Sequence, residues 1–136
     1  SQTRLPLIEQ GVQEALNAGI VVVMAAGNQG QNLGTDVQVS PAVVGFGNGT
    51  ANGAITVGSV DVNTGLLSSF SNYGSLVEIS APGSLDTGLG TAGGLYSTSK
   101  NDGYARMMGT SQAAPLVAAA AALAIQFFKQ RNVPYN

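Results

Sequence analysis

The fold is decided at Met108-Gly109-Thr110-Ser111-Gln112-Ala113-Ala114-Pro115, where an extended stretch punctuated by glycine turns into an apolar helix. We expect this helix from about Ser111 to Arg131, because the residues after Pro115 are almost all small and apolar. A helix that is apolar on every side is typical of a buried one. A serine at its mouth lies near unpaired backbone N–H groups and the positive end of the helix dipole. This environment favours an oxygen nucleophile at Ser111 and the oxyanion it generates, whereas the plainer interpretation is an N-cap hydroxyl at Ser111 or Thr110.

The composition indicates one compact unit without an internal repeat or an interdomain linker. Hydrophobic residues make up 44% of the 136 residues and charged residues only 9%, with a net charge of −2. This balance gives no reason to expect nucleic acid or an acidic membrane as a partner. The apolar block 118–125 is too short for a membrane span. The lack of cysteine excludes disulfides and thiolate metal sites.

The first 28 residues predict a helix followed by a buried strand. Apolar residues at positions 5, 8, 12, 15 and 16 recur at helical spacing, which predicts an amphipathic helix over about 6–18. The run 20–26 has no polar residue and is rich in β-branched side chains, which indicates a strand buried on both faces of a parallel sheet. Asn28 follows this strand, and ligands bind at the carboxyl ends of strands in open α/β sheets. Asn28 is therefore a candidate site residue, or else an asparagine that tolerates a turn.

The middle of the chain predicts two more strands and a hairpin. A buried strand over 54–60 ends in Asp61, for which a solvated or loop-capping role is favoured over calcium binding, because one carboxylate is a poor calcium site. A short strand is expected over 77–80, closed by Ser80-Ala81-Pro82-Gly83. The segments 95–98 and 104–108 predict a hairpin, because the connection between them ends in the turn signal Asp-Gly. Loops are expected over 40–53 and 88–94.

Two motifs resemble those of a known enzyme family. Gly109-Thr110-Ser111-x-Ala113-x-Pro115, followed by a helix of small residues, resembles the nucleophile motif of the subtilisin-like serine proteases, the subtilases of peptidase family S8. The element Ala25-Ala26-Gly27-Asn28 is similar to the end of the subtilase strand whose terminal asparagine donates to the oxyanion. Weaker similarities lie over 67–74 and 80–83, and the resemblance runs from about residue 6 to residue 131.

The resemblance implies an α/β fold and a partial catalytic domain. The expected architecture is the C-terminal part of a subtilisin-like three-layer fold, with a mostly parallel sheet, a buried helix after the nucleophile and a β-hairpin before it. Residues 1–136 are expected to form the C-terminal portion of a peptidase S8 catalytic domain, because in the family the aspartate and histidine of the triad lie upstream of everything in this chain. The chain has no histidine, and a triad of this type needs one as its general base.

The resemblance also implies a serine endopeptidase activity that acts on polypeptides through an acyl-enzyme. Ser111 is the expected nucleophile, Asn28 and the Ser111 backbone N–H are the expected oxyanion donors, and Ala25, Ala26 and Gly27 are expected to line the substrate cleft as exposed backbone. This chain alone is expected to be inactive and to require the N-terminal half of the domain as its partner. No cofactor, nucleic acid or membrane is expected, and the family implies secretion.

Other interpretations remain open at this point. The chain can be a cloned or proteolytic fragment, or one chain of a nicked enzyme. It can be a non-catalytic structural or interaction module with a subtilase half-fold, although such a module has no chemical need of both Ser111 and Asn28. It can also come from a sedolisin-like serine-carboxyl protease, in which a glutamate replaces the histidine, but that family places an aspartate where Asn28 stands.

An isolated chain of this kind is expected to associate with another chain. The strands 20–26 and 54–60 are apolar enough to need cover on both faces, and two helices provide only part of that cover. We therefore expect an exposed apolar sheet edge, and either self-association or pairing with the missing half.

Overall fold

A four-stranded sheet organises the described residues of the computed structural model, which are 2–45, 53–86 and 92–134. Its strands are β2 (Val22–Ala25), β4 (Ala54–Asp61), β5 (Ile79–Asp86) and β6 (Ala92–Gly93), in the order β2-β4-β5-β6. The pairs β2–β4 and β4–β5 are parallel, and the short β6 is antiparallel to β5. The mostly parallel sheet is therefore confirmed. The expected loop segments 46–52 and 88–91 lie outside the described residues.

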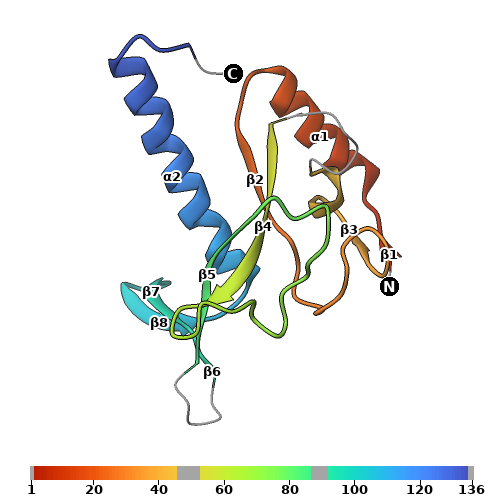
Figure 1. The fold of residues 1–136 in the computed structure, drawn as a ribbon, viewed down its shortest axis with the longest axis vertical. Helices are drawn as coiled ribbons and strands as arrows, with labels where there is room; N and C mark the ends of the chain where they lie inside the picture. The colour runs from red at the N-terminus through yellow and green to blue at the C-terminus, as the bar shows by residue number, and fades with distance from the viewer. Residues whose placement is uncertain (1, 46–52, 87–91, 135–136) are drawn as a thin grey trace.

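One helix lies on each face of this sheet, which gives three layers (Figure 1). Helix α1 (Pro6–Asn17) buries Val12 in a cluster with Met24 and Ala54. Helix α2 (Thr110–Gln130) packs through Ala113 and Val117 on the opposite face, in a cluster with Val57 and Ala81. Alternate side chains of a strand point to opposite faces, so β2 and β4 contribute to both clusters. The expected three-layer α/β arrangement is thus present.

The edge strand β2 and the inner strand β5 differ from their expected lengths. Strand β2 begins only at Val22, which pairs with Ala54, while Ile20 and Val21 before it are exposed. Strand β5 continues through Pro82 and Gly83 to Asp86, so the expectation that this proline and glycine close the strand is wrong. A proline removes a single N–H from a ladder, and the β4–β5 register shifts next to it, between Val60 and Asp61, which lets the pairing continue.

Helix α2 is buried on one side only. Its buried residues are Thr110, Ala113 and Val117, which face β2, β4 and β5. Leu123 is 67% exposed and Phe127 is 50% exposed on the rest of its surface. The expectation of a helix buried on every side is therefore met on one side only, because this chain supplies a sheet against that side and no layer beyond it among the described residues.

Helix α2 is longer than the apolar block 118–125 that the sequence analysis considered for a membrane span. Within the part of the chain that the structure describes, α2 is the one helix long and apolar enough to cross a bilayer by length and composition, because it has 21 residues and an 18-residue stretch within it has a mean hydropathy of 1.5. Core helices of soluble proteins share this composition. Helix α2 packs one side against three strands of the sheet, and 6% of its 18-residue apolar stretch is buried.

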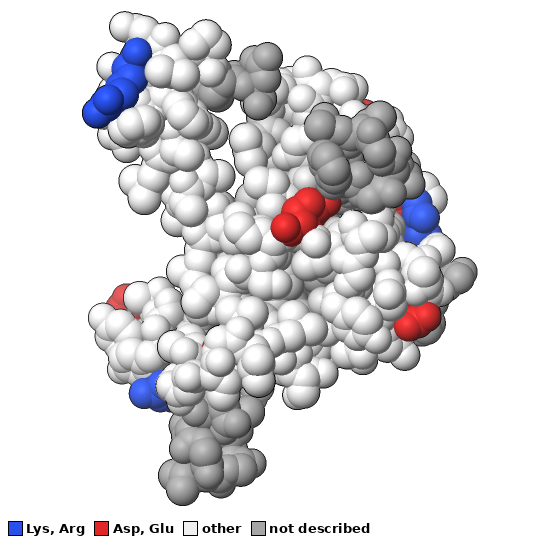
Figure 2. Space-filling view, in the orientation of Figure 1, with Lys and Arg blue, Asp and Glu red and all other residues white. Residues whose placement is uncertain are grey.

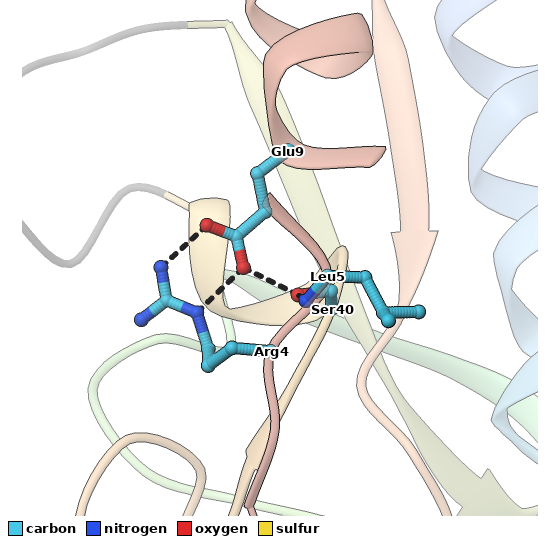
Figure 3. A network of polar contacts seen from close by, with 4 residues as sticks. All are labelled: Arg4, Leu5, Glu9 and Ser40. Carbon is cyan, nitrogen blue, oxygen red and sulfur yellow. Dashed lines mark hydrogen bonds and ion pairs between the residues drawn. The ribbon is translucent and has the colours of Figure 1, made fainter. Parts of the chain in front are cut away.

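The remaining elements connect this framework to the chain ends. A small parallel pair joins β1 (Gln2–Thr3) to β3 (Gln38–Val39), just before the 3₁₀ helix η1 (Ala42–Val44). Arg4 forms an ion pair with Glu9 on α1, and the Ser40 hydroxyl donates to the same carboxylate while accepting from the Leu5 N–H (Figure 3). The contacts with Arg4 and then Ser40 hold the pKa of Glu9 below its ordinary value. This network fastens the start of α1 to the segment before η1.

The predicted hairpin is confirmed and leads directly into α2. Strands β7 (Leu95–Ser99) and β8 (Gly103–Met107) pair antiparallel. Asn101 and Asp102 take positive φ angles of 60° and 55° in the turn, a conformation that these two residue types tolerate better than most. The hairpin delivers the chain to Gly109 and Ser111.

Candidate active site

The end of β2 and the start of α2 meet at one point, where Asn28 contacts the residue before Ser111. Asn28 lies three residues after β2, and its side-chain Oδ1 accepts a hydrogen bond of 2.9 Å from the Thr110 backbone N–H. Ser111 is the second residue of α2 and is exposed. The structure therefore brings the two residues singled out from the sequence to the same end of the sheet, although they are 83 positions apart.

The orientation of the Asn28 amide is fixed by what surrounds its oxygen. Oδ1 accepts from both the backbone N–H of Thr110, at 2.9 Å, and the Thr110 hydroxyl, at 3.0 Å. Because a backbone N–H can only donate, the atom that faces it is the amide oxygen. The amide nitrogen Nδ2 then points away from Thr110, and its two hydrogens are available to an acceptor outside this contact. An oxyanion donor requires this orientation.

Thr110 joins the two segments through its side chain. Its fully buried hydroxyl donates to Asn28 Oδ1 and accepts from the Gly27 N–H at 3.1 Å. The sequence offered an N-cap hydroxyl at Ser111 or Thr110 as the plainer alternative to a nucleophile at Ser111, and it assigned Thr110 no other role. That capping role is wrong, because Gly109 is the N-cap and no side chain caps the helix. The actual partner, Asn28, is distant in sequence and gives no local signal.

Gly109 allows the close approach of these segments. Its φ of +150° is a conformation that other residues rarely adopt, and a Cβ there would lie 3.3 Å from Asn28 Nδ2 and 3.0 Å from Gln112 Oε1. Its N–H donates to the Gly83 carbonyl of β5 at 2.9 Å. The turn before Ser111 is therefore held by the sheet on one side and by Asn28 on the other.

The backbone N–H and the hydroxyl of Ser111 have no hydrogen-bond partner within the part of the chain that the structure describes. The N–H groups of Gln112 and Ala113 donate to the Gly109 carbonyl, and that of Thr110 donates to Asn28. Among the described residues, none accepts from the Ser111 N–H and none bonds to its hydroxyl. The first N–H groups of a helix have no partner within the helix, so the Ser111 N–H is a second free donor beside Asn28 Nδ2. A nucleophile and two oxyanion donors can be built from these groups.

A hollow of about 380 Å³ opens beside Ser111, between the β7–β8 hairpin and the first turns of α2. Figure 2 shows the surface notched between α2 and the hairpin, with charged side chains only as isolated spots on this face. Most of the lining is apolar or hydroxyl-bearing, and it consists of Leu95, Tyr96, Ser97, Thr98, Ala105, Met107, Ser111, Gln112, Pro115 and Leu116. None of these described lining residues is a carboxylate, a histidine or a lysine.

The three residues expected to line a substrate cleft behave differently from one another. Ala26 is fully buried, so the expectation of exposed backbone is wrong there. Its N–H donates to Val57 and its carbonyl accepts from the Asn72 amide. Ala25 and Gly27 are partly exposed.

Asn72 is a buried residue of the site that the sequence interpretation missed. Its segment 67–74 was noted only for a weak family similarity and was given no site residue, yet the Asn72 side chain binds the loop that carries Asn28. An asparagine between Ser71 and Tyr73 carries no local signal of this, because its partners lie more than 40 residues earlier in the chain.

Asp61 caps a loop, as favoured from the sequence. Its Oδ1 accepts from the backbone N–H groups of Asn63 and Thr64, and its Oδ2 accepts from the Ser84 hydroxyl. Among the described residues, no group of three or more acidic, histidine or cysteine side chains lies close enough together to hold a metal ion.

Comparison with known proteins identifies the family of this arrangement. The family model described as the Subtilase family matches residues 2–134, so the chain belongs to the subtilase family. It is 43% identical over 115 residues to a subtilisin-like protease of Coccidioides posadasii, covering 82% of this chain and 24% of that protein. It is 40% identical over 116 residues to thermitase of Thermoactinomyces vulgaris, covering 85% of this chain and 34% of thermitase.

A solved structure confirms the fold. The crystal structure of a cold adapted subtilisin-like serine proteinase superposes with a TM-score of 0.72 at 34% identity, over 90% of this chain and 38% of that one. The chain therefore has a subtilisin-like α/β fold and spans about a quarter to a third of the curated relatives described above.

Proposed function

We propose that this chain supplies the nucleophile and the oxyanion donors of a serine endopeptidase, as the C-terminal portion of a peptidase S8 catalytic domain. The observation that carries the proposal is the anchoring of Asn28 through its oxygen to the residue before Ser111. Among the described residues, none accepts from the Asn28 Nδ2 hydrogens or the Ser111 N–H, and none bonds to the Ser111 hydroxyl. A site for acyl transfer needs this combination.

The reaction that fits these groups is acyl transfer from a peptide to water. Ser111 Oγ attacks the carbonyl carbon of the scissile bond while its proton passes to a histidine base. The carbonyl oxygen becomes an oxyanion that accepts from Asn28 Nδ2 and the Ser111 N–H. The C–N bond then breaks, the amine leaves with the proton from the imidazolium, and water hydrolyses the Ser111 ester by the same steps. No cofactor is needed.

The histidine and its orienting aspartate come from a second segment in this proposal. The chain itself contains no histidine. The N-terminal half of the same catalytic domain is the proposed partner, and without it the chain is inactive. The bare apolar surface of α2, with Leu116, Leu123 and Phe127 exposed, supports a protein layer against this helix.

Substrate and location follow from the same proposal. A polypeptide is the substrate, and the partly exposed residues Ala25 and Gly27 contact it beside Asn28. Family membership supports a secreted enzyme.

A fluorophosphonate probe tests the proposal, because it labels only an activated serine. Intact mass is measured for the chain alone, for the chain mixed with its N-terminal half, and for the same mixture carrying Ser111→Ala. We expect one added probe mass in the second sample only. Equal lack of labelling in all three, with both halves folded, would instead support a non-catalytic module. Labelling of the chain alone would contradict the need for a base from the second segment.

A further inference from the structure

Asn72 is fully buried and uses its whole side chain to bind one loop. Its Nδ2 donates to the Ala26 carbonyl at 2.9 Å and to Gln29 Oε1 at 2.7 Å. Its Oδ1 accepts from the backbone N–H groups of Gln29 and Gln31, each at 3.1 Å. Two donors and two accepted bonds saturate a primary amide, so this side chain is fully committed to residues 26–31.

The backbone of Asn72 adds to the same attachment. Its N–H donates to the Gly27 carbonyl at 3.0 Å. The side chain also packs directly on Gly27, where a Cβ would lie 2.6 Å from Asn72 Nδ2, and Gly27 has a φ of +100°. Asn72 thus holds residues on both sides of Asn28 and makes no hydrogen bond to Asn28 itself.

Asn28 is therefore located by two separate attachments. Thr110 on α2 fixes the oxygen of its side chain, and Asn72 fixes the backbone before and after it. The first attachment determines which way the amide faces. The second determines where the amide lies relative to Ser111, because the backbone path of a loop sets the position of the side chain it carries.

We propose that Asn72 is a positioning residue for the oxyanion donor Asn28. This rests on the proposed function, because it assigns Asn72 a role in the same reaction. Asn72 does not touch the substrate. Oxyanion stabilisation depends on the donor being fixed near 3 Å from the developing charge, and a misplacement of about 1 Å can lower a rate about 10²-fold.

The residue type follows from the bonds it makes. Serine is too short to reach both Ala26 and Gln31, and aspartate lacks the donors that the Ala26 carbonyl and Gln29 Oε1 require. Leucine has the same branching and the same number of side-chain heavy atoms, but it leaves four polar groups of the loop without their partner. Asparagine satisfies all four at once.

A double-mutant cycle separates positioning from a general effect on folding. It is measured in the complemented enzyme, which is this chain assembled with the N-terminal half of the catalytic domain. Asn72→Ser is made alone and in the Asn28→Ala background, and kcat is divided by the titrated concentration of active sites. We expect Asn72→Ser alone to lower kcat about 10- to 100-fold with KM within about twofold, and to lower it no further once Asn28 is alanine. Equal losses in both backgrounds, or a change confined to KM, would overturn the proposal.

Thr56→Val is the matched control for this cycle. Thr56 is fully buried and its hydroxyl donates to the Ala42 carbonyl, away from the loop 26–31. We expect this variant to lower stability and to leave kcat per active site unchanged. A drop in kcat as large as that of Asn72→Ser would show that loss of any buried hydrogen bond has the same effect.

Amide hydrogen exchange on the unaltered chain gives a readout that needs neither activity nor a folded variant. We expect the Gln29 and Gln31 N–H groups to exchange at least about 100-fold more slowly than that of exposed Thr35, since Asn72 accepts from both. Exchange as fast as that of Thr35 would overturn the proposal. If exchange is slow and the complemented enzyme shows no serine reactivity, the proposed function fails while the attachment by Asn72 stands.

Discussion

The surroundings of Asn28 and of Ser111 differ in how far this chain completes them. Asn28 is exposed, yet its Oδ1 accepts two hydrogen bonds from Thr110, and Asn72 hydrogen-bonds to the loop around it. Ser111 is also exposed, but no described residue bonds to its hydroxyl, and an apolar hollow lies beside it. Under the proposed function, the described residues complete the surroundings of the oxyanion donor Asn28 and leave open the surroundings of the nucleophile Ser111.

The largest effect on kcat is expected from a change at Ser111, whose surroundings the described residues leave incomplete. Ser111→Ala in the complemented enzyme removes the attacking oxygen and should lower kcat about 10⁶-fold, a magnitude established on subtilisin, a member of this family. Turnover of a peptide amide substrate measures it. Ser75→Ala, at an exposed serine in another loop, is the control and should retain full activity. Residual activity within tenfold of the unaltered enzyme would remove Ser111 from the mechanism.

A change at Asn28 should lower kcat less than a change at Ser111. Asn28→Ala removes one oxyanion donor and should lower kcat about 10²–10³-fold with little change in KM, again a magnitude for which subtilisin is the worked case. Steady-state kinetics measure both constants. Asn17→Ala, an exposed asparagine at the end of α1, is the matched control. A rise in KM without a fall in kcat would assign Asn28 to ground-state binding instead.

The bare face of α2 can be tested without any chemistry. Leu123→Glu changes a side chain that is 67% exposed, so it should leave the free energy of unfolding of the chain within about 0.5 kcal/mol. It should weaken self-association or binding of the N-terminal half by about 1.5–3 kcal/mol, the value of burying one leucine. Sedimentation and titration of the two halves measure this. Gln130→Glu, exposed at the end of the same helix, should change neither quantity, and an unaltered chain that stays monomeric and highly stable would contradict an uncovered apolar face.

The link between the two regions is Thr110. Thr110→Val keeps the shape but leaves the Gly27 N–H without its side-chain acceptor and removes one bond to Asn28 Oδ1. We expect a loss of about 1–3 kcal/mol in the free energy of unfolding, because a buried donor is left unpaired. Thr110→Ser keeps the hydroxyl and should recover most of this loss. Denaturant unfolding of the chain decides between them, and equal stability of the valine variant and the unaltered chain would show that the hydroxyl links nothing.

The smallest effect is expected far from both regions, at the contact of Arg4 and Ser40 with Glu9. The pKa of Glu9 is lowered, so its contribution to stability is present above the ordinary carboxylate pKa and is lost as the pH falls through the lowered value. Arg4 is largely exposed, so the contribution is at most about 1 kcal/mol. The unfolding free energies of Arg4→Ala and the unaltered chain should therefore differ slightly at pH 7 and converge in acid. A difference that grows in acid would contradict this sign.

Much of the framework could be predicted from the sequence because its signals are local. The helical spacing before Ala18 gave α1, the apolar run 54–60 gave β4, and the small residues after Pro115 gave α2. Strand β5 was cut short because Pro82 and Gly83 usually end strands. Its continuation depends on pairing with β4, which no local pattern contains.

The site was predictable only in part, for the same physical reason. Ser111 and Asn28 were singled out by their motifs, and the structure places them at one end of the sheet. The residues that hold Asn28 in place were not singled out, because their hydrogen bonds join distant parts of the sequence. Thr110 bonds to Asn28 across 82 positions, and Asn72 bonds to the loop around Asn28 across 41 to 46. A residue type shows which bonds a side chain can make, whereas the fold decides which groups are near enough to make them.

The two hydrogen bonds from Thr110 to Asn28 have a consequence for the time course of assembly. Because both lone-pair positions of Asn28 Oδ1 are occupied inside this chain, the donor is ordered when the chain folds and not when a second segment arrives. Activity after mixing should then rise with the rate of encounter between the halves, in proportion to their concentrations. No slow, concentration-independent lag for rearrangement of the oxyanion donor is expected.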